Sequence, residues 1–245
     1  MRTIKEIIKA LLPARLVDCL AYIRNRNSDD VRSDGYSVES YSQEGEDMIL
    51  RRIFQNQETG FYVDVGAHHP FRFSNTYYLY KQGWQGINID AMPGSMDLFR
   101  RFRQRDINIE SGVALIDAQY TYFVFKAEAL NTFDESLAQQ YINAGRELVS
   151  KTQLRARPLA DLLKEHLPSG QRIDLLSVDV EGFDLDVLKS NDWQLYKPRV
   201  LITEELRSVS GERNDSVRDY LAKVGYREFA RTYNSVFYMS AQESA

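Results

Sequence analysis

The chain has 245 residues, of which 43% are hydrophobic and 27% charged, the composition of an ordinary globular protein. Its net charge of −4 gives no whole-chain field that would attract nucleic acid. The single cysteine, Cys19, excludes an intrachain disulfide, and no cysteine and histidine cluster has the spacing of a zinc site. We therefore expect a globular protein in a reducing, cytoplasmic compartment, with no nucleic-acid partner.

The first 27 residues predict an amphipathic helix with a basic character. Lys9, Arg15 and Asp18 interrupt its apolar runs, so neither a membrane-spanning helix nor a signal peptide fits. Such a helix has two open roles: packing on the domain or on a second subunit, or peripheral contact with the inner face of a membrane. After a polar linker, we divide the chain into residues 1–40 and a domain of residues 41–245.

Beyond the linker, helical and strand patterns alternate along the chain. In order, they predict a helix at 41–50 capped by Ser42, a strand at 61–65, a helix at 74–83, a strand at 84–90, a helix at 96–105 and a strand at 107–109. A hairpin of 113–116 with 120–125, helices within 131–148 and at 157–167, a strand at 173–178, a helix at 183–190, a strand at 199–203, a helix at 217–224 and an antiparallel pair of 226–230 with 236–239 complete the series. This alternation predicts a doubly wound α/β sheet.

The stretch from Phe61 to Pro70 is the centre of the predicted site. It begins as a buried strand of apolar residues and then turns sharply at Gly66. A strand that ends in such a turn is typical of the carboxyl edge of a parallel sheet, where loops leave a crevice for a ligand. We expect a nucleotide-type cofactor in this crevice.

The residues after Gly66 argue against a dinucleotide. A nicotinamide fingerprint needs three glycines, so that the backbone closes on a pyrophosphate. Here Ala67, His68, His69 and Pro70 follow instead, and the chain has no phosphate-cradling Gly-Lys-Ser/Thr. A nicotinamide enzyme of the same architecture therefore stays only as a rival interpretation.

A nucleoside with a cationic, amino-acid-like tail fits better. Asp64 is expected to face the ammonium or sulfonium end, and Asp90, 24 residues after Gly66, is spaced to bind both ribose hydroxyls. Met92 and the turn at 111–112 are expected to line the adenine. The predicted S-adenosylmethionine site comprises Asp64, Gly66, Ala67, Asp90, Ala91, Met92, Ser111 and Gly112.

Short segments between Tyr41 and Met239 carry a family resemblance. They are Ser42-Gln43 with Glu46-Asp47, Val63-Asp-Val-Gly-Ala67, Ser74-Asn-Thr76, Gly83-Trp84 with Gly86, Ile89-Asp90 with Pro93, and Ser177-Val-Asp-Val-Glu-Gly182. Together they resemble the FkbM family of methyltransferases. The resemblance implies a Rossmann-like class I fold with a mostly parallel sheet and an antiparallel last strand, and usually O-methylation of glycan or secondary-metabolite hydroxyls. Because the family places Asn and Gly after Gly-Ala, contacts around the methionine tail are expected to differ here.

Methyl transfer to a hydroxyl needs a proton acceptor, and a positioned base contributes roughly 10²–10⁴-fold in rate. Asp179 and Glu181 end an apolar strand beside the switch point of the sheet, while His68 and His69 lie on the loop next to the cofactor. We expect Asp179 or one of these histidines to be the base, with Glu181 holding acceptor hydroxyls. The sequence leaves the choice open.

Two further features stay open at this point. A divalent cation held by Asp179, Glu181 and Glu204 is an alternative that we do not predict, so no metal ligand is assigned. Asn131-Thr132, with the helix that follows, is either a lid over the acceptor or a plain connection.

The sequence predicts a cytoplasmic S-adenosylmethionine-dependent O-methyltransferase that acts on a sugar or glycan precursor, as in polysaccharide biosynthesis. The alternatives are methylation of a secondary metabolite or lipid-linked hydroxyl, and a catalytically silent adenosyl-binding module in a glycan-assembly complex. The expected partner is a small-molecule or glycan acceptor, and a homo-oligomer is compatible with the sequence.

Overall fold

The computed structural model describes residues 37–205 and 215–241. Contacts divide the chain into two compact units, Met1–Glu39 and Ser40–Ala245. The predicted N-terminal helix and most of the predicted linker lie outside the described residues, and the fold below is that of the second unit. Within the described ranges, no helix has the length and apolar character needed to cross a bilayer.

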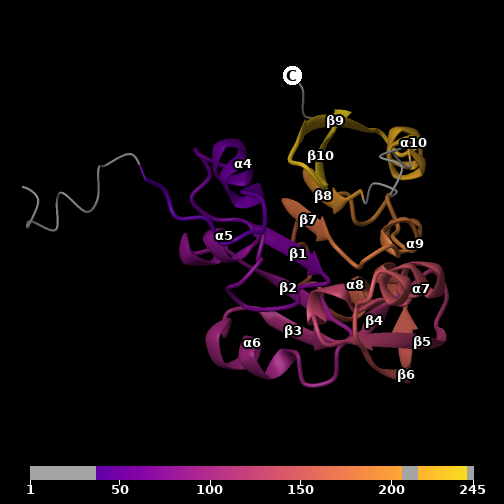
Figure 1. The fold of residues 1–245 in the computed structure, drawn as a ribbon. Helices are drawn as coiled ribbons and strands as arrows, with labels where there is room; N and C mark the ends of the chain where they lie inside the picture. Colours follow the sequence, from indigo (N-terminus) through magenta and orange to yellow (C-terminus); the bar gives the residue numbers. More distant parts are fainter. Residues whose placement is uncertain (1–36, 206–214, 242–245) are drawn as a thin grey trace, which may run out of the picture. The chain divides into compact units, whose positions relative to one another are not determined.

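A seven-stranded sheet forms the centre of the second unit (Figure 1). In spatial order, its strands are β3 (Ile107–Glu110), β2 (Gln85–Asp90), β1 (Phe61–Val65), β7 (Leu175–Val178), β8 (Val200–Glu204), β10 (Ser235–Ser240) and β9 (Tyr226–Arg231). Neighbours from β3 to β8 are parallel, whereas β10 runs antiparallel to both β8 and β9. This order confirms the predicted doubly wound sheet with an antiparallel last strand.

Helices cover both faces of the sheet (Figure 1). They are α8 (Leu159–His166), α9 (Asp184–Lys189) and α10 (Ser216–Lys223) on one face, and α4 (Glu46–Ile53) and α5 (Tyr77–Lys81) on the other. All five residues of β1 are buried: Val63 and Val65 pack toward the first set, and Tyr62 toward the second. Burial on both faces explains why these strands are continuous apolar runs instead of alternating ones.

Arg103, which follows α6 (Met96–Phe102), is buried on the face of the sheet that α4 and α5 cover. Its Nε lies 2.8 Å from Oδ2 of Asp106, and both side chains are 0% exposed. Nη1 donates to the carbonyl of Pro70 at 3.1 Å, and Nη2 donates to Oγ1 of Thr76 at 3.0 Å. Such a pair is tolerated in a core because its donors and acceptors are satisfied, and here it also tethers the loop that follows β1.

A second sheet is inserted between β3 and β7. It has the order β4, β6, β5 and is accompanied by a short 3₁₀ helix and α7. The elements are β4 (Gly112–Val113), β5 (Ala118–Phe125), η1 (Glu128–Leu130), α7 (Glu135–Asn143) and β6 (Leu148–Arg157). The predicted hairpin is wrong, because β4 and β5 do not pair with each other but flank β6, a strand that was not predicted.

Two helices begin later than predicted. α4 follows Gly45, which has a left-handed φ of 86°, and Ser42 accepts a hydrogen bond from the N–H of Asp47 at 3.1 Å from outside the helix. α5 begins at Tyr77, whose N–H donates to Oγ of Ser74 at 3.1 Å. The remaining predicted helices, and the strands of the seven-stranded sheet, are confirmed with small differences at their ends.

Candidate cofactor and acceptor site

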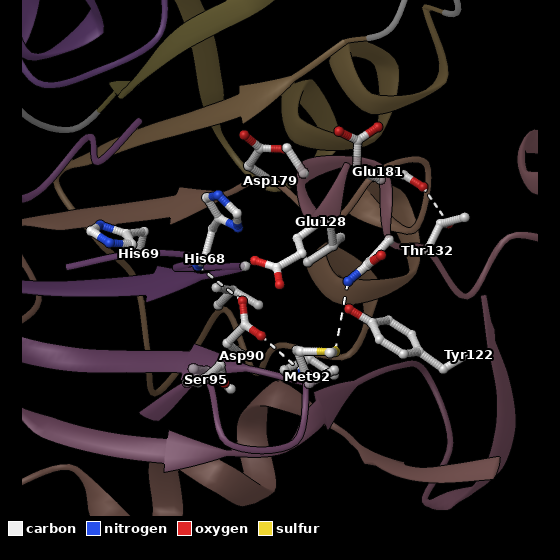
Figure 2. Close-up of a pocket in the computed structure, with 18 of the residues that line it drawn as sticks. His68, His69, Asp90, Met92, Ser95, Tyr122, Glu128, Thr132, Asp179 and Glu181 are labelled. Carbon is white, nitrogen blue, oxygen red and sulfur yellow. Dashed lines mark hydrogen bonds between the residues drawn. The ribbon is translucent and has the colours of Figure 1, made fainter. Parts of the chain in front are cut away.

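The carboxyl ends of β1, β2 and β7 meet at one edge of the sheet, where the strand order reverses between β1 and β7. The loops that follow these strands, with residues of the inserted segment, enclose a pocket of about 340 Å³ (Figure 2). This volume lies in the range of small-molecule sites, roughly 300–1,000 Å³. Nine of the twelve predicted site residues line the pocket: Gly66, His68, His69, Asp90, Ala91, Met92, Ser111, Asp179 and Glu181.

Asp90 ends β2, and its carboxylate is held by two backbone N–H groups (Figure 2). Oδ2 accepts from the N–H of His68 at 2.9 Å, and Oδ1 accepts from the N–H of Met92 at 2.8 Å. Burial raises the pKa of Asp90, and these two bonds oppose the rise. Because each carboxylate oxygen has two lone pairs, each keeps room for another donor. The group therefore offers two fixed acceptors, which suit the adjacent hydroxyls of a ribose.

Four carboxyl groups gather at the ends of β7 and β8. Burial, followed by the charges of Asp64 and Glu46, raises the pKa of Asp179 to about 6. Burial and the neighbouring charge of Asp179 raise the pKa of Glu181 to about 8 and that of Asp184 to about 8. The pKa of Glu204 is raised to about 11 by the same causes, so this group is expected to stay protonated at neutral pH and to donate a hydrogen bond to Asp179. Asp179 therefore has the lowest pKa of the four, and at neutral pH we expect it to be ionised while the other three hold protons.

The turn that carries Glu181 is fixed by the inserted segment. Glu181 has a left-handed φ of 51°, a conformation that is uncommon outside glycine. The hydroxyl of Thr132 donates to its carbonyl at 2.7 Å (Figure 2), and the hydroxyl of Tyr141 donates to its Oε2 at 2.6 Å. Helix α7 therefore sets the direction in which the Glu181 carboxyl group points.

The two histidines have defined tautomers. Nη2 of Arg72 lies 3.1 Å from Nε2 of His68, and because a guanidinium only donates, Nε2 accepts and the ring proton lies on Nδ1. The backbone N–H groups of Phe71 and Arg72 both donate to Nδ1 of His69, at 3.2 and 3.1 Å, so its proton lies on Nε2. Burial, the largest cause, lowers the pKa of both rings. Each neutral ring thus presents an N–H donor and has its lone pair already occupied.

Three predicted site residues lie outside the pocket, which corrects their assignment. Asp64 is 5% exposed inside the sheet, where its Oδ2 accepts from the hydroxyl of Thr76 at 2.8 Å and burial raises its pKa. Ala67 packs in a small core cluster with residues of α6. Gly112 pairs with β6, and a Cβ there would meet Phe133 at 2.8 Å. This glycine therefore serves the close packing of β4 against β6 and Phe133.

The inserted segment contributes lining residues that sequence reasoning missed, namely Tyr122, Glu128 and Phe133. Asn131 and Thr132, one candidate lid, line the pocket as well. Asn131 accepts from the N–H of Phe125 at 2.8 Å and directs its Nδ2 at Sδ of Met92, 3.7 Å away. These residues lie on β5 or in the segment that follows it, where Thr132 forms a bridge with Phe123 of β5, so no spacing along the chain marks them.

Asp179, Glu181 and Glu204 are the described residues that together have ligand atoms for a metal ion, with one oxygen from each within 4.8 Å of the others. Burial also raises the pKa of all three carboxyl groups, which favours protons on them. The expectation that no metal is required stays a prediction.

Comparison with known proteins identifies a family whose model matches this chain. Residues 64–228 match the model of a family described as the methyltransferase FkbM domain. The matched range begins within β1, ends within β9, and includes every residue of the pocket except Gln43.

The individual proteins that the chain resembles match it either over a short stretch or at low sequence identity. Over 64 residues the chain is 42% identical to methyltransferase sdnD of Sordaria araneosa. This aligned stretch is 22% of this chain and 25% of that protein. Among solved structures, the METTL16 methyltransferase domain is 12% identical with a TM-score of 0.45, over 80% of this chain and 66% of that one. A TehB-like methyltransferase of Corynebacterium glutamicum is 11% identical with a TM-score of 0.41, over 94% of this chain and 100% of that one.

Proposed function

The chain belongs to the FkbM methyltransferase family, and from this premise we propose that it is an S-adenosylmethionine-dependent O-methyltransferase acting on a hydroxyl of a sugar or glycan precursor. One observation carries the proposal. Asp90, at the end of β2, and the Asp179–Glu181 pair, at the end of β7, line the same pocket of about 340 Å³ (Figure 2).

The residues of the pocket fit the donor. Asp90 offers two held carboxylate oxygens for the ribose, while Met92 and Tyr122 supply apolar surface for the adenine. Gly66 lets the ends of β1 and β7 approach closely, since a Cβ there would lie 1.7 Å from the carbonyl oxygen of Asp179. The lining residues include carboxylates and lack lysine and arginine, which favours a cationic sulfonium over a diphosphate.

The donor, when bound, supplies an electrophilic methyl carbon: the C–O bond forms as the S–CH₃ bond breaks, the sulfonium becomes a neutral thioether, and the acceptor hydroxyl loses its proton. The chain's task is to orient that hydroxyl and to take the proton. Orientation alone contributes on the order of 7–11 kcal/mol in well-placed reactions. Asp179, with a pKa of about 6, is ionised at neutral pH and accepts the proton.

The hydrogen bonds of the histidines narrow the choice of base. Nε2 of His68 and Nδ1 of His69 already accept hydrogen bonds, and the other ring nitrogens carry protons. Neither ring has a free lone pair for a hydroxyl proton in this arrangement. We therefore assign the base to Asp179 and give the histidines a role as donors.

The acceptor side of the pocket supports a polyol. Glu181, with a pKa of about 8, is mostly protonated at neutral pH, so its carboxyl group both donates and accepts hydrogen bonds. Tyr141 holds it at 2.6 Å. A sugar presents adjacent hydroxyls that match both Glu181 and an ionised Asp179, whereas an otherwise apolar metabolite with a single hydroxyl would match only one of them.

Calorimetry with S-adenosylmethionine and S-adenosylhomocysteine, followed by transfer of a labelled methyl group to nucleotide sugars and glycans, tests the proposal. We expect both cofactor forms to bind and label to enter a hydroxyl of a sugar acceptor. Binding without turnover on any acceptor would favour the silent adenosyl-binding module. Turnover confined to secondary-metabolite or lipid-linked hydroxyls would contradict the sugar assignment alone.

A further inference from the structure

We propose that the mouth of the pocket docks on an anionic membrane surface, through a patch made of Phe73, Leu98 and Phe102 with Arg72 and Arg101. These five residues are called the rim patch below. The inference concerns an interaction surface and holds whichever donor the pocket binds. An enzyme docked in this way would meet its acceptor at the lipid surface.

The apolar part of the rim patch is exposed at the pocket mouth. Phe73 is 44% exposed and Leu98 is 43% exposed, although both also line the pocket. Phe102, which is 41% exposed, follows Leu98 by one turn on α6, so the two share one face of that helix. The other face of α6 buries Met96 and Phe99. Packing within the domain therefore uses one face of α6 and leaves an apolar face in water.

Ring contacts join the loop after β1 to α6. The His68 ring is stacked with that of Phe73, with centroids 6.4 Å apart. On the other side of the loop, the Phe71 ring lies 5.7 Å from that of His69 and 5.0 Å from that of Phe102. The exposed rings at the two ends of this series therefore belong to one continuous surface, and a contiguous apolar surface of this kind marks an interaction site.

Phe73 is held outward by a strained backbone. Its φ of 59° is left-handed, which a non-glycine residue adopts at a cost and which clusters at functional sites. Arg103 fixes the same loop by donating to the carbonyl of Pro70 at 3.1 Å. Because the ring stays 44% exposed, the strain gains no burial within the domain.

Two arginines supply the charge of the rim patch. The guanidinium of Arg72 lies 5.1 Å from the ring centroid of Phe73, and that of Arg101 lies 5.1 Å from the ring centroid of Phe102. Among the described residues, no ion pair includes either arginine. Each apolar ring therefore has a cation beside it with no carboxylate to neutralise it.

The surrounding surface is basic as well. Between residues 71 and 106, the exposed charged side chains are five basic residues and one acidic residue, Asp97, which lies 2.8 Å from Arg100. The chain as a whole has a net charge of −4. A local excess of cations on an acidic protein attracts a polyanionic surface to this side of the molecule.

A lipid surface fits the rim patch better than a protein partner does. Three partly exposed side chains are far less than the roughly 800 Å² per partner that a stable protein interface buries. Membrane binding instead sums shallow insertion of a few apolar side chains with the attraction of nearby cations to anionic lipids. A protein seated on the mouth would also close the pocket, whereas a membrane brings lipid-linked acceptors to it.

The test is cosedimentation of the full chain with phosphatidylcholine vesicles, pure or containing about a third phosphatidylglycerol. We expect binding to the anionic vesicles that weakens with added salt, and little binding to the neutral ones. Arg72→Ala and Arg101→Ala should each weaken binding roughly fivefold, and Phe102→Ala roughly threefold or more. Arg101→Ala and Phe102→Ala should keep their affinity for S-adenosylhomocysteine, since neither side chain lines the pocket.

Arg146→Ala and Phe229→Ala are matched controls that should bind vesicles as the unsubstituted chain does. Arg146 is exposed and belongs to none of the ion pairs of the described residues. Phe229 is 54% exposed on β9, at the edge of the sheet opposite to β3 and α6 (Figure 1). The basic residues 1–27 are the same in every variant.

Full vesicle binding in Arg101→Ala and Phe102→Ala would overturn the rim patch and leave the binding to another part of the chain. Equal losses in the two controls, or no preference of the unsubstituted chain for anionic vesicles, would overturn it too. A dimer in sedimentation equilibrium that Phe102→Ala abolishes would assign the surface to a second copy instead. If the unsubstituted chain fails to bind S-adenosylhomocysteine, the proposed function fails and the vesicle result stands by itself.

Discussion

At the scale of single residues, crowding of carboxyl groups gives neighbouring acids different protonation. Asp179, Glu181 and Glu204 have pKa values raised to about 6, about 8 and about 11, with burial as the largest cause in each case. Environments that separate the pKa values of paired acids assign the roles of proton acceptor and donor. At neutral pH the group therefore holds one ionised carboxylate, at the position where the proposed mechanism needs a base.

Asp179→Asn should lower kcat by roughly 10²–10⁴-fold and leave S-adenosylhomocysteine affinity unchanged, because the amide keeps the shape but accepts no proton. In the unsubstituted chain, kcat should rise with pH across about 6, as Asp179 loses its proton. Steady-state kinetics across pH, with calorimetry, measure both. Asp186→Asn, on α9 and outside the pocket lining, is the control; full activity in Asp179→Asn would remove Asp179 as the base.

Glu204 should make the protein less stable as pH rises. Its pKa is raised to about 11 in the fold, so above about pH 4.5 the folded state keeps a proton that the unfolded state releases. Glu204→Gln removes this proton uptake and should stabilise the protein by on the order of 1–3 kcal/mol at pH 8. The gain should vanish near pH 4. Urea unfolding at both pH values tests this, and an equal gain at both would show that proton uptake is not the cause.

Asp90→Ala should weaken S-adenosylhomocysteine binding roughly 10–100-fold, since two hydrogen bonds to the ribose are lost. Glu110→Ala is a close control, because Glu110 pairs with Asp90 in register on β3 and also accepts from a backbone N–H, that of Gly94 at 2.8 Å. Calorimetry on the two variants should separate them. Unchanged affinity in Asp90→Ala would show that the ribose is bound elsewhere.

At the scale of elements, the turn after β1 and the end of β7 are in direct contact. Gly66 has a φ of 83°, and a Cβ there would lie 1.7 Å from the carbonyl oxygen of Asp179. The first segment carries His68 and His69, which line the pocket, and the second carries Asp179, the proposed base. Whatever separates them should therefore affect both stability and binding.

Comparing Gly66→Ala with Gly83→Ala distinguishes the cost of a left-handed backbone from the cost of a steric clash between the new Cβ and its neighbours. Gly83 also has a positive φ, 97°, but a Cβ there has nothing within 4 Å. We expect Gly83→Ala to cost about 1–2 kcal/mol from the left-handed backbone, and Gly66→Ala about 1–3 kcal/mol more from overpacking. Only Gly66→Ala should lose S-adenosylhomocysteine affinity. Urea midpoints and calorimetry provide the measurement, and equal effects of the two substitutions would contradict it.

The elements that sequence reasoning found and missed differ in burial. β1 and β7 are buried along their whole length, so their apolar runs identify them. β6 was missed because most of Leu148–Arg157 is exposed or half-buried, and its polar and charged side chains give no apolar pattern. The hairpin was wrongly predicted for the same reason. β4 and β5 flank β6 in the sheet, and because β6 was missed, each appeared to have only the other as a pairing partner.

At the scale of the whole molecule, the order of strands along the chain predicts some residues of the site but not others. Asp90, Asp179 and Glu181 follow parallel strands, so topology alone brings them to one edge. Tyr141 contacts Glu181 across 40 residues of chain, and Glu128 lines the pocket from the inserted segment, so no local pattern encodes either of them. Asp64 was misplaced because a residue at a strand end is as able to face the helix layer as the crevice, and here it bonds to Thr76.

We propose that the edge of the sheet beyond β1, β2 and β7 binds an adenosyl donor with its sulfur beside Asp179. A crystal structure of the chain with S-adenosylhomocysteine tests this most directly. We expect both ribose hydroxyls to bind the carboxylate of Asp90 and the sulfur to face Asp179. A structure at saturating ligand that showed this pocket empty, or the nucleoside bound elsewhere, would contradict it.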